Sequence, residues 1–480
     1  MTDRDHYSSP LAERYASKAM LELWSHRTRY GLWRRLWLAL AEAERELGLP
    51  IPDEALAQMR AHLDDADLAV AARYERRFRH DVMAHVHAFA DQAPAARPFL
   101  HLGATSAFVT DNADLVVMRD GLRLLLGRVV AVLSALEGFA GRTANLPCLA
   151  YTHFQPAQLT TVGKRATLWM QDFGLDVEEL CHRLNTLRFR GCQGTTGTQA
   201  SFLELFGGDH GKVRELERRV TAKVGFREQY AVTGQTYPRK ADSAVLDSLS
   251  GIAQSAAKMA GDLRLLQHEG ELLEPFETEQ IGSSAMAYKR NPMRAERISG
   301  LARYVISLQA NGAHTAASQW LERTLDDSAN RRLTLPEAFL GTDAILVLAT
   351  NIAAGLEVRE DVIRRHVAEQ MPFMATERWL MLGVASGGDR QSLHEVIRRH
   401  SLAVAEAVSR GAPNDLLERL AADPAFAEVP AAQLQAQLDP ITYTGRAAYQ
   451  VGEFLEEYLR PLLARARPLA AEAESAEVRV

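Results

Sequence analysis

The chain has 480 residues, with 61 acidic and 55 basic side chains and a formal net charge of −6. This balance argues against general nucleic-acid binding, because proteins that track phosphates are usually basic, so any anion site must be local. No window approaches the ~18 continuous apolar residues of a membrane helix, and the first ten residues are too polar for a secretory signal. The three cysteines lack the spacing of a zinc site or a disulfide framework. We expect a cytoplasmic protein with no membrane or nucleic-acid partner.

Helical periodicity dominates the chain, with apolar residues at three-and-four spacing in stretches rich in Ala, Leu, Glu and Arg. Breaks at residues 93–106 and 355–359 predict an N-terminal helical domain (1–105), a central bundle (106–358) and a C-terminal helical domain (359–480). The longest central patterns predict helices over about residues 156–187, 242–273, 292–318 and 329–354. Such helices reach roughly 40–50 Å, which suits a bundle core, so we predict an all-α protein. The tail after Arg467 is predicted to be frayed.

Arg79, His80 and Asp81 open the first polar cluster, and His85 and His87 follow closely. On a helix His80 and His87 share a face, while His85 points away. The i, i+4 histidine pair of common zinc helices is therefore absent, and we predict no metal site. The segment HLGATS (101–106) would by itself be a polar loop between domains.

Two further segments lie in the central region. His153 stands in Thr-His-Phe-Gln-Pro, just before a helix that Pro156 should open, where a histidine is commonly a capping or packing residue. The glycine-rich run 191–197 looks like a phosphate cradle. It lacks the Gly-Lys-Ser/Thr ending of a P-loop and follows no predicted strand, so nucleotide hydrolysis is not expected.

The most informative segment runs from Gly282 to Pro292 and reads Gly-Ser-Ser-Ala-Met-Ala-Tyr-Lys-Arg-Asn-Pro. Asn291 is a good N-cap and Pro292 suits a first helical position, so a helix should follow with its positive end toward the loop. Lys289 and Arg290 add full charges. A serine hydroxyl becomes a proton acceptor only where cations and N–H groups stabilise its alkoxide. The alternative is an exposed basic turn.

The wider segment GSSAMAYKRNPMRAER (282–297) resembles the signature of the fumarase/aspartase superfamily, and most closely that of the animal-type adenylosuccinate lyase family. The family usually has proline where this chain has Ala287, which leaves Ser283, Lys289 and Asn291 in place. Further resemblance, in the expected order along most of the chain, is carried by LAERYASKAM, RHDVMAHVHAF, HLGATS, YTHFQPAQ, GTTGTQASFLELF, GQTYPRK, LDDSANRR, PFMATE and TYTGRA.

The resemblance implies a β-elimination that releases fumarate from adenylosuccinate, giving AMP, and from the succinyl-aminoimidazole-carboxamide ribotide of purine synthesis. By this resemblance Ser283, with Ser284 as the less favoured neighbour, is the general base and His153 is the general acid. It also implies that no organic cofactor or metal is needed, and that four subunits form a homotetramer whose active sites each use three chains.

The resemblance also assigns supporting roles. Glu296 would orient His153, and His80 would support proton transfer at the leaving group, whereas Arg331 is expected to be structural. Substrate contacts are implied for Arg14, Tyr15, Arg79, His80, Asp81, His101, Thr105, Ser106, Gln235, Lys289, Asn291, Arg297, Ser328 and Arg332.

Two other interpretations stay open. One is a sister lyase that releases fumarate from another succinyl compound, such as argininosuccinate. The other is a non-catalytic binding or structural protein on the same fold. Retention of Ser283, His153 and Lys289 together argues against the second.

Overall fold

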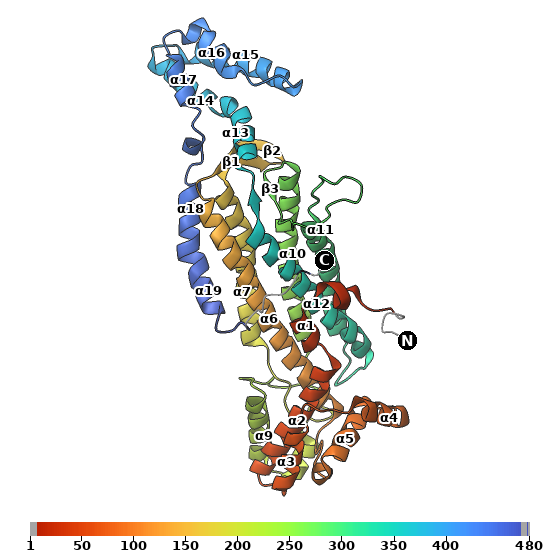
Figure 1. Cartoon of the computed structure of the whole chain (residues 1–480). Helices are drawn as coiled ribbons and strands as arrows, with labels where there is room; N and C mark the ends of the chain where they lie inside the picture. The colour runs from red at the N-terminus through yellow and green to blue at the C-terminus, as the bar shows by residue number, and fades with distance from the viewer. Residues whose placement is uncertain (1–6, 472–477, 479–480) are drawn as a thin grey trace.

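A computed structural model describes residues 7–471 and 478, so most of the tail predicted to be frayed lies outside the described residues. The chain forms an elongated bundle of long helices with a smaller helical group at each end (Figure 1). The prediction of an all-α protein is confirmed, since the only strands in the described part are two short pairs.

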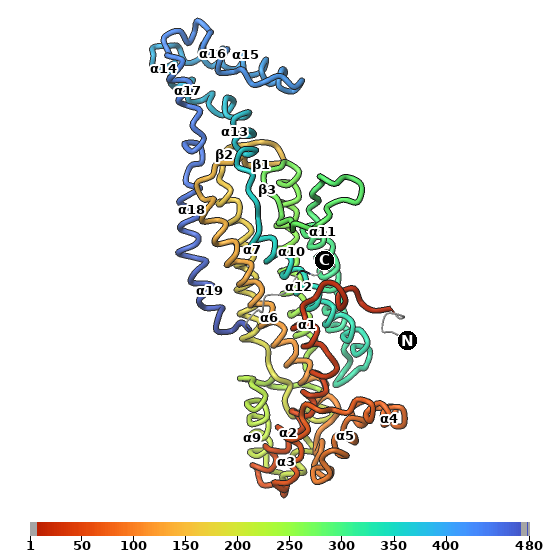
Figure 2. The backbone as a smooth tube through the Cα atoms, viewed as in Figure 1, coloured from red at the N-terminus to blue at the C-terminus, as the bar shows by residue number. Residues whose placement is uncertain are grey.

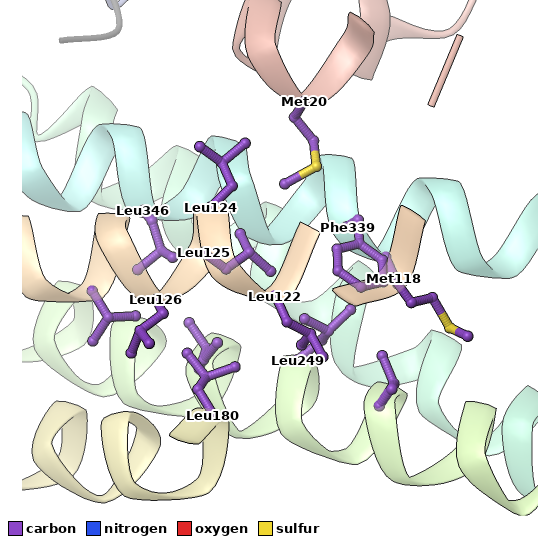
Figure 3. Packing of buried hydrophobic residues seen from close by; sticks show 14 of the residues in the cluster. Met20, Met118, Leu122, Leu124, Leu125, Leu126, Leu180, Leu249, Phe339 and Leu346 are labelled. Carbon is purple, nitrogen blue, oxygen red and sulfur yellow. The ribbon is translucent and has the colours of Figure 1, made fainter. Parts of the chain in front are cut away.

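Five long helices form the bundle, and helices run close to the ranges predicted for 242–273, 292–318 and 329–354. The longest helix begins where the predicted break at 93–106 ends. Its leucines and valines pack against the neighbouring helices, as Figure 3 shows for Leu122, Leu125 and Leu126. The five are α6 (Ser106–Arg142), α7 (Val162–Thr186), α10 (Lys240–His268), α11 (Met293–Ala317) and α12 (Asp326–Gly355).

Two of these helices, α6 and α12, are long and apolar enough to cross a membrane by length and composition alone. In their most apolar windows 61% and 78% of the residues are buried inside the structure. A helix that is apolar all round is equally what the centre of a bundle requires, because every face meets another helix. Their burial therefore accounts for their hydropathy.

The lower end in Figure 1 gathers helices from two parts of the chain. Helix α9 follows the bundle helix α7 in sequence, yet it packs on α2, where Lys223 lies 3.1 Å from Glu42 and 2.9 Å from Glu46. The predicted domain division stays a prediction, and this contact crosses its first boundary. The elements here are α2 (His26–Glu46), α3 (Asp53–Ala61), α4 (Leu68–Phe78), α5 (Asp81–Gln92), α8 (Ala200–Leu205) and α9 (His210–Lys223), and α1 (Lys18–Leu23) lies above them against α6 and α12.

The upper end carries a separate small core around the buried Trp379, and the chain then returns along the outside of α7 (Figure 2). Two strand pairs lie where this end meets the bundle: β1 (Pro147–Thr152) with β2 (Gln155–Thr161), and β3 (Leu272–Leu273) with β4 (Glu357–Val358). The helices are α13 (Glu360–Met374), α14 (Thr376–Ala385), α15 (Arg390–Ser409), α16 (Leu416–Ala422), α17 (Ala431–Ala436), α18 (Ala447–Glu453) and α19 (Arg460–Ala466).

The prediction that Pro156 opens a helix is wrong. Pro156 lies in β2, opposite Tyr151, and the helix begins only at Val162. The side chain of Thr161 caps it, accepting a hydrogen bond from the Lys164 N–H at 3.1 Å. β-branched Thr160 and Thr161 suit the strand that precedes the cap.

Candidate active site

Eight of the implied substrate-contact residues line one cavity of about 1110 Å³ between the lower helices and the bundle. The cavity lies where α4 ends, where α5 and α6 begin, and beside the start of α12. Backbone N–H groups at the starts of α5 and α6 favour an anion, as does the positive end of each helix dipole. The eight residues are Arg79, His80, Asp81, Thr105, Ser106, Gln235, Ser328 and Arg332.

His80 is held in a defined orientation at this cavity. It is the N-cap of α5, where its Nδ1 accepts a hydrogen bond from the Met83 N–H at 3.3 Å. An accepting Nδ1 places the proton on Nε2, which lies 3.3 Å from the Ser106 hydroxyl oxygen. His80 can thus present a donor to the cavity. Beside it, Arg332 lies 3.3 Å from Asp81, and this pair is half exposed.

The wall of the cavity includes a buried network of charges that no sequence pattern predicted. Arg239 contacts Asp111 at 3.1 Å and Asp327 at 2.7 Å. Burial would raise the pKa of Asp111, but the nearby arginines, Arg239 first, hold it below its ordinary value. The network fixes the start of α12 against α6, so it positions the cavity wall.

Arg331, for which a structural role is predicted, belongs to the same network and also lines the cavity. Its guanidinium contacts Asp242 at 2.6 Å and Asp114 at 3.0 Å, and it donates to the Tyr237 hydroxyl at 2.5 Å. The acidic partners stand 89 or more positions away in sequence, so no short motif signals the pairing.

His153 lies far from this cavity, at the tip of the β1–β2 hairpin near α13 (Figure 1). His153 and Phe154 form the two-residue turn between the paired residues Thr152 and Gln155. Both have positive φ, 54° and 57°, which is the geometry of a type I′ turn without its usual glycine or asparagine. The His153 side chain is exposed, and it forms no ion pair with Glu296, which lies on the first turn of α11.

The loop that carries Ser283 is closed by its own side chains. The Ser283 hydroxyl accepts from the Met286 N–H at 3.1 Å, and the Asn291 side chain donates to the Gly282 carbonyl at 2.8 Å. Glycine is required at 282, because a Cβ there would lie 2.1 Å from the Lys289 carbonyl oxygen. Asn291 thus ties the two ends of the loop together.

The prediction that Asn291 caps the following helix is wrong. Helix α11 begins at Met293, and the buried carboxylate of Glu274 accepts from the N–H groups of Arg294 and Ala295, at 3.0 Å each. Those two N–H groups are therefore already occupied. The donors that the structure gives to the Ser283 hydroxyl are the N–H groups of Met286, at 3.1 Å, and Ala285, at 3.4 Å.

Lys289 and Glu296 line a second cavity of about 820 Å³. Its other charged residues are mostly basic, which favours a carboxylate ligand. The basic residues of this cavity are Lys258, Arg264, His268, Lys289 and Arg290, and the acidic ones are Asp262 and Glu296.

The remaining predicted contacts lie outside both cavities. Arg297 stacks over the Tyr15 ring, 5.8 Å from its centroid, and Arg14 is exposed beside it. His101 faces inward and its Nδ1 accepts from the Trp37 N–H at 2.9 Å. Burial, with a smaller effect from His80, lowers the pKa of His101 to about 4.

The histidines weighed for a metal have other surroundings. His85 is buried against the Tyr30 ring at 3.7 Å, and burial lowers its pKa to about 4. Within residues 7–471, no three His, Cys, Asp or Glu side chains gather in a way that could hold a metal ion.

The implied catalytic residues thus stand on three different parts of the chain: His80 at the large cavity, His153 at the hairpin, and Ser283, Lys289 and Glu296 on and after the 282–292 loop. The chain as a whole has the fold of a known class of enzymes. Its structure is similar to the 3-carboxy-cis,cis-muconate lactonizing enzyme from Pseudomonas putida, with a TM-score of 0.80, 24% identity, and 96% and 99% of the two chains covered. It is also similar to a fumarate lyase from Mesorhizobium sp. BNC1, with a TM-score of 0.76, 23% identity and the same coverage.

Sequence comparison narrows that class. The family model described as "Lyase" matches residues 11–307, which makes the chain a lyase of the fumarase/aspartase superfamily. The model described as "Adenylosuccinate lyase C-terminus" matches residues 372–454.

The curated relatives match over almost the full chain. The chain is 51% identical to the adenylosuccinate lyase of Saccharomyces cerevisiae, with 95% of each sequence covered. It is 48% identical to that of Schizosaccharomyces pombe, with 97% of each covered, and 47% identical to that of Schistosoma mansoni, with 96% of this chain and 97% of the relative covered. The chain belongs to the adenylosuccinate lyase family.

Proposed function

We propose that the chain cleaves adenylosuccinate to AMP and fumarate by β-elimination, and cleaves the succinyl-aminoimidazole-carboxamide ribotide in the same way. The observation that carries this proposal is the 51% identity to an adenylosuccinate lyase along 95% of the chain. The reaction breaks a C–N bond without oxidation or reduction, so acid, base and electrostatic stabilisation suffice. We further propose that the enzyme acts in the cytoplasm.

The base in this proposal is Ser283, which removes a proton from the carbon beside the succinyl carboxylate. A free serine is far too weak a base, so the alkoxide must be stabilised where it forms. The Met286 N–H at 3.1 Å from its oxygen supports that role, as does the positive charge of Lys289 on the same loop. One well-aimed donor is worth about 3 to 4 kcal/mol in such a site.

Lys289 and Asn291 would hold the carboxylate that gains negative charge as the proton leaves. His153 would then protonate the departing nitrogen, so both electrons of the broken bond stay with the amine. Its place at an exposed hairpin tip supports delivery into a site on another subunit.

The nucleotide portion fits the large cavity. The starts of α5 and α6, together with Arg79 and Arg332, offer donors and positive charge for a phosphate, and forked guanidinium groups bind phosphate and carboxylate well. His80 would donate a hydrogen bond near the leaving group, and its Nε2, 3.3 Å from the Ser106 hydroxyl at the cavity, supports this role.

We propose that four copies associate and that each active site draws residues from three of them. The support is that His80, at the large cavity, lies far within one chain from His153, at the β1–β2 hairpin, although a single reaction would need both together. Apolar side chains on the bundle helices, such as Leu168 and Leu175, are exposed in one chain, and packing of another subunit against the bundle would bury them.

The test is fumarate release by the purified protein, offered adenylosuccinate and argininosuccinate separately without added metal. Turnover of adenylosuccinate alone is expected. Turnover of argininosuccinate instead would overturn the nucleotide assignment. Release of no fumarate from either substrate would favour a non-catalytic protein. A folded protein that binds AMP without turnover would likewise favour a non-catalytic protein.

A further inference from the structure

The hairpin that carries His153 has a buried base and an exposed tip. Cys148, Leu149 and Leu159 are buried, whereas His153 and Phe154 at the tip are exposed. The pairing register shifts between Leu149 and Tyr151, so the strand carries a bulge just before the tip. Bulges bend a strand and redirect the residues beyond them. The direction of His153 therefore depends on what holds this bulge.

Arg165, on the first turn of α7, holds the bulge from both sides. Its Nη2 donates to the Leu149 carbonyl, and its guanidinium carbon lies 6.0 Å from the centre of the Tyr151 ring. The Tyr151 ring in turn lies 6.0 Å from that of Phe154, the neighbour of His153. A single side chain thus connects the helix to the tip.

Glu271 completes the support from beneath. Its side chain is 1% exposed, and its Oε2 lies 3.8 Å from Nη1 of Arg165. Its Oε1 lies 3.0 Å from Nδ1 of His366 on α13, and its carbonyl accepts from the Arg359 N–H at 2.9 Å. The carboxylate is thus fixed between α13, the β3–β4 pair and Arg165.

The charges of this pair depend on each other. In the described structure neither Nη1 of Arg165 nor Oε2 of Glu271 has a hydrogen-bond partner, and both atoms are buried. A buried charge that loses its counter-charge is strongly unfavourable, so removing one member should displace the other. Burial first, and then the nearby carboxylate of Glu271, raise the pKa of Tyr151 to about 12.

We infer that Arg165 and Glu271 are positioning residues for His153: their buried ion pair holds the hairpin bulge and so directs the imidazole at the departing nitrogen. This inference rests on the proposed function. In this inference neither residue contacts the substrate, because both side chains are largely buried. Displacing a catalytic group by about 1 Å can cost on the order of 10²-fold in rate, so loss of the pair should be visible in kcat.

The experiment measures kcat and KM for adenylosuccinate in Arg165→Met and Glu271→Gln, each made in the wild-type chain and in His153→Gln. In the wild-type chain kcat should fall about 10- to 100-fold, with KM within about twofold, because only the proton transfer is misdirected. In the His153→Gln chain neither change should lower kcat further. A merely structural role would lower kcat by the same factor in both backgrounds.

Arg165→Lys keeps the charge beside Glu271 but offers one nitrogen in place of the fork, so its loss of kcat should be smaller than that of Arg165→Met. If Arg165→Met fails to fold, Arg165→Lys can be measured in its place to test the positioning role. Arg183→Met is the matched control: Arg183 stands on the last turn of the same helix, 2.7 Å from Glu179, and far along it from the hairpin. Its kcat should be unchanged.

The outcomes separate this inference from the proposed function. Wild-type protein without turnover would overturn the proposed reaction, and full activity in His153→Gln would overturn the role of His153. If the wild-type enzyme is active and His153→Gln is impaired, then normal kcat in Arg165→Met, or a loss that adds to that of His153→Gln, overturns the positioning role alone.

Discussion

At the scale of single residues, the proposed base is a serine, whose hydroxyl is unreactive alone and depends on its surroundings for basicity. Ser283→Ala removes the hydroxyl while leaving the Gly282–Asn291 closure of the loop intact. We expect a folded protein whose kcat on adenylosuccinate is lower by at least ~10². Steady-state kinetics beside a circular dichroism spectrum would check this.

Ser284→Ala is the control, since Ser284 is exposed and was the less favoured neighbour. Near-normal turnover in Ser283→Ala combined with a loss in Ser284→Ala would exchange their roles.

Glu44 is a buried carboxyl that has no role in the proposed reaction and no hydrogen-bond partner among the described residues. It is fully buried on α2, and neither of its oxygens has a hydrogen-bond partner among the described residues. Burial raises its pKa from 4.5 to about 9. The folded chain therefore keeps a proton that the unfolded chain releases above about pH 4.5, and stability from this group is lost as pH rises toward 9.

We predict that Glu44→Gln raises the Tm relative to wild type, and that the difference is larger at pH 8 than at pH 6. Between about pH 4.5 and 9 the Glu44 carboxyl lowers the free energy of unfolding of the wild type by at most about 1.4 kcal/mol per pH unit. The amide in Glu44→Gln does not titrate, so the variant lacks this pH dependence. Thermal denaturation at the two pH values measures it, with the exposed Glu418→Gln as control. A difference that is constant with pH would contradict the protonated state.

At the scale of elements, the start of α11 depends on a side chain from outside the helix. Glu274 accepts from two N–H groups that would otherwise be buried without partners. We predict that Glu274→Ala lowers the free energy of unfolding by about 1 to 2 kcal/mol, because those donors lose their acceptor. Hydrogen exchange at Arg294 and Ala295 should speed up as the first turn frays.

Glu277→Ala is the matched control. Glu277 pairs with the Arg294 side chain but is largely exposed, so its removal should change stability little. If both substitutions lowered the free energy of unfolding equally, the hydrogen bonds from the start of α11 to Glu274 would not be the cause of the loss.

At the scale of the whole molecule, the separation of the implied catalytic residues predicts complementation between subunits. Ser283→Ala and His153→Gln should each be nearly inactive. When the two are unfolded together and refolded at equal amounts, activity should return toward about a quarter of the wild-type value, because some sites then combine intact residues from different chains. The measurement is fumarate release before and after mixing.

Separately refolded samples, mixed afterwards without exchange, are the control. Failure of co-refolded samples to gain activity, with both variants present in one oligomer by native mass spectrometry, would mean that each site uses residues of a single chain.

The sequence by itself determined the helical class, the four predicted bundle helices apart from the start of the first, and the motifs that carry the family resemblance. These are local properties: apolar spacing reports which face of a helix is buried, and a motif reports the side chains needed for a reaction. It did not determine where Pro156 and Asn291 lie, because hairpin pairing and the Glu274 cap compete with local propensity and both depend on distant residues.

Tertiary structure alone decided the partners of buried charges. Arg239 joins Asp111 and Arg165 joins Glu271, across 128 and 106 positions of sequence. Such pairs form because folding removes water from both groups at one place, and no local pattern records which charges will meet there. The same holds for the large cavity, whose lining residues come from six helices, α1, α2, α4, α5, α6 and α12.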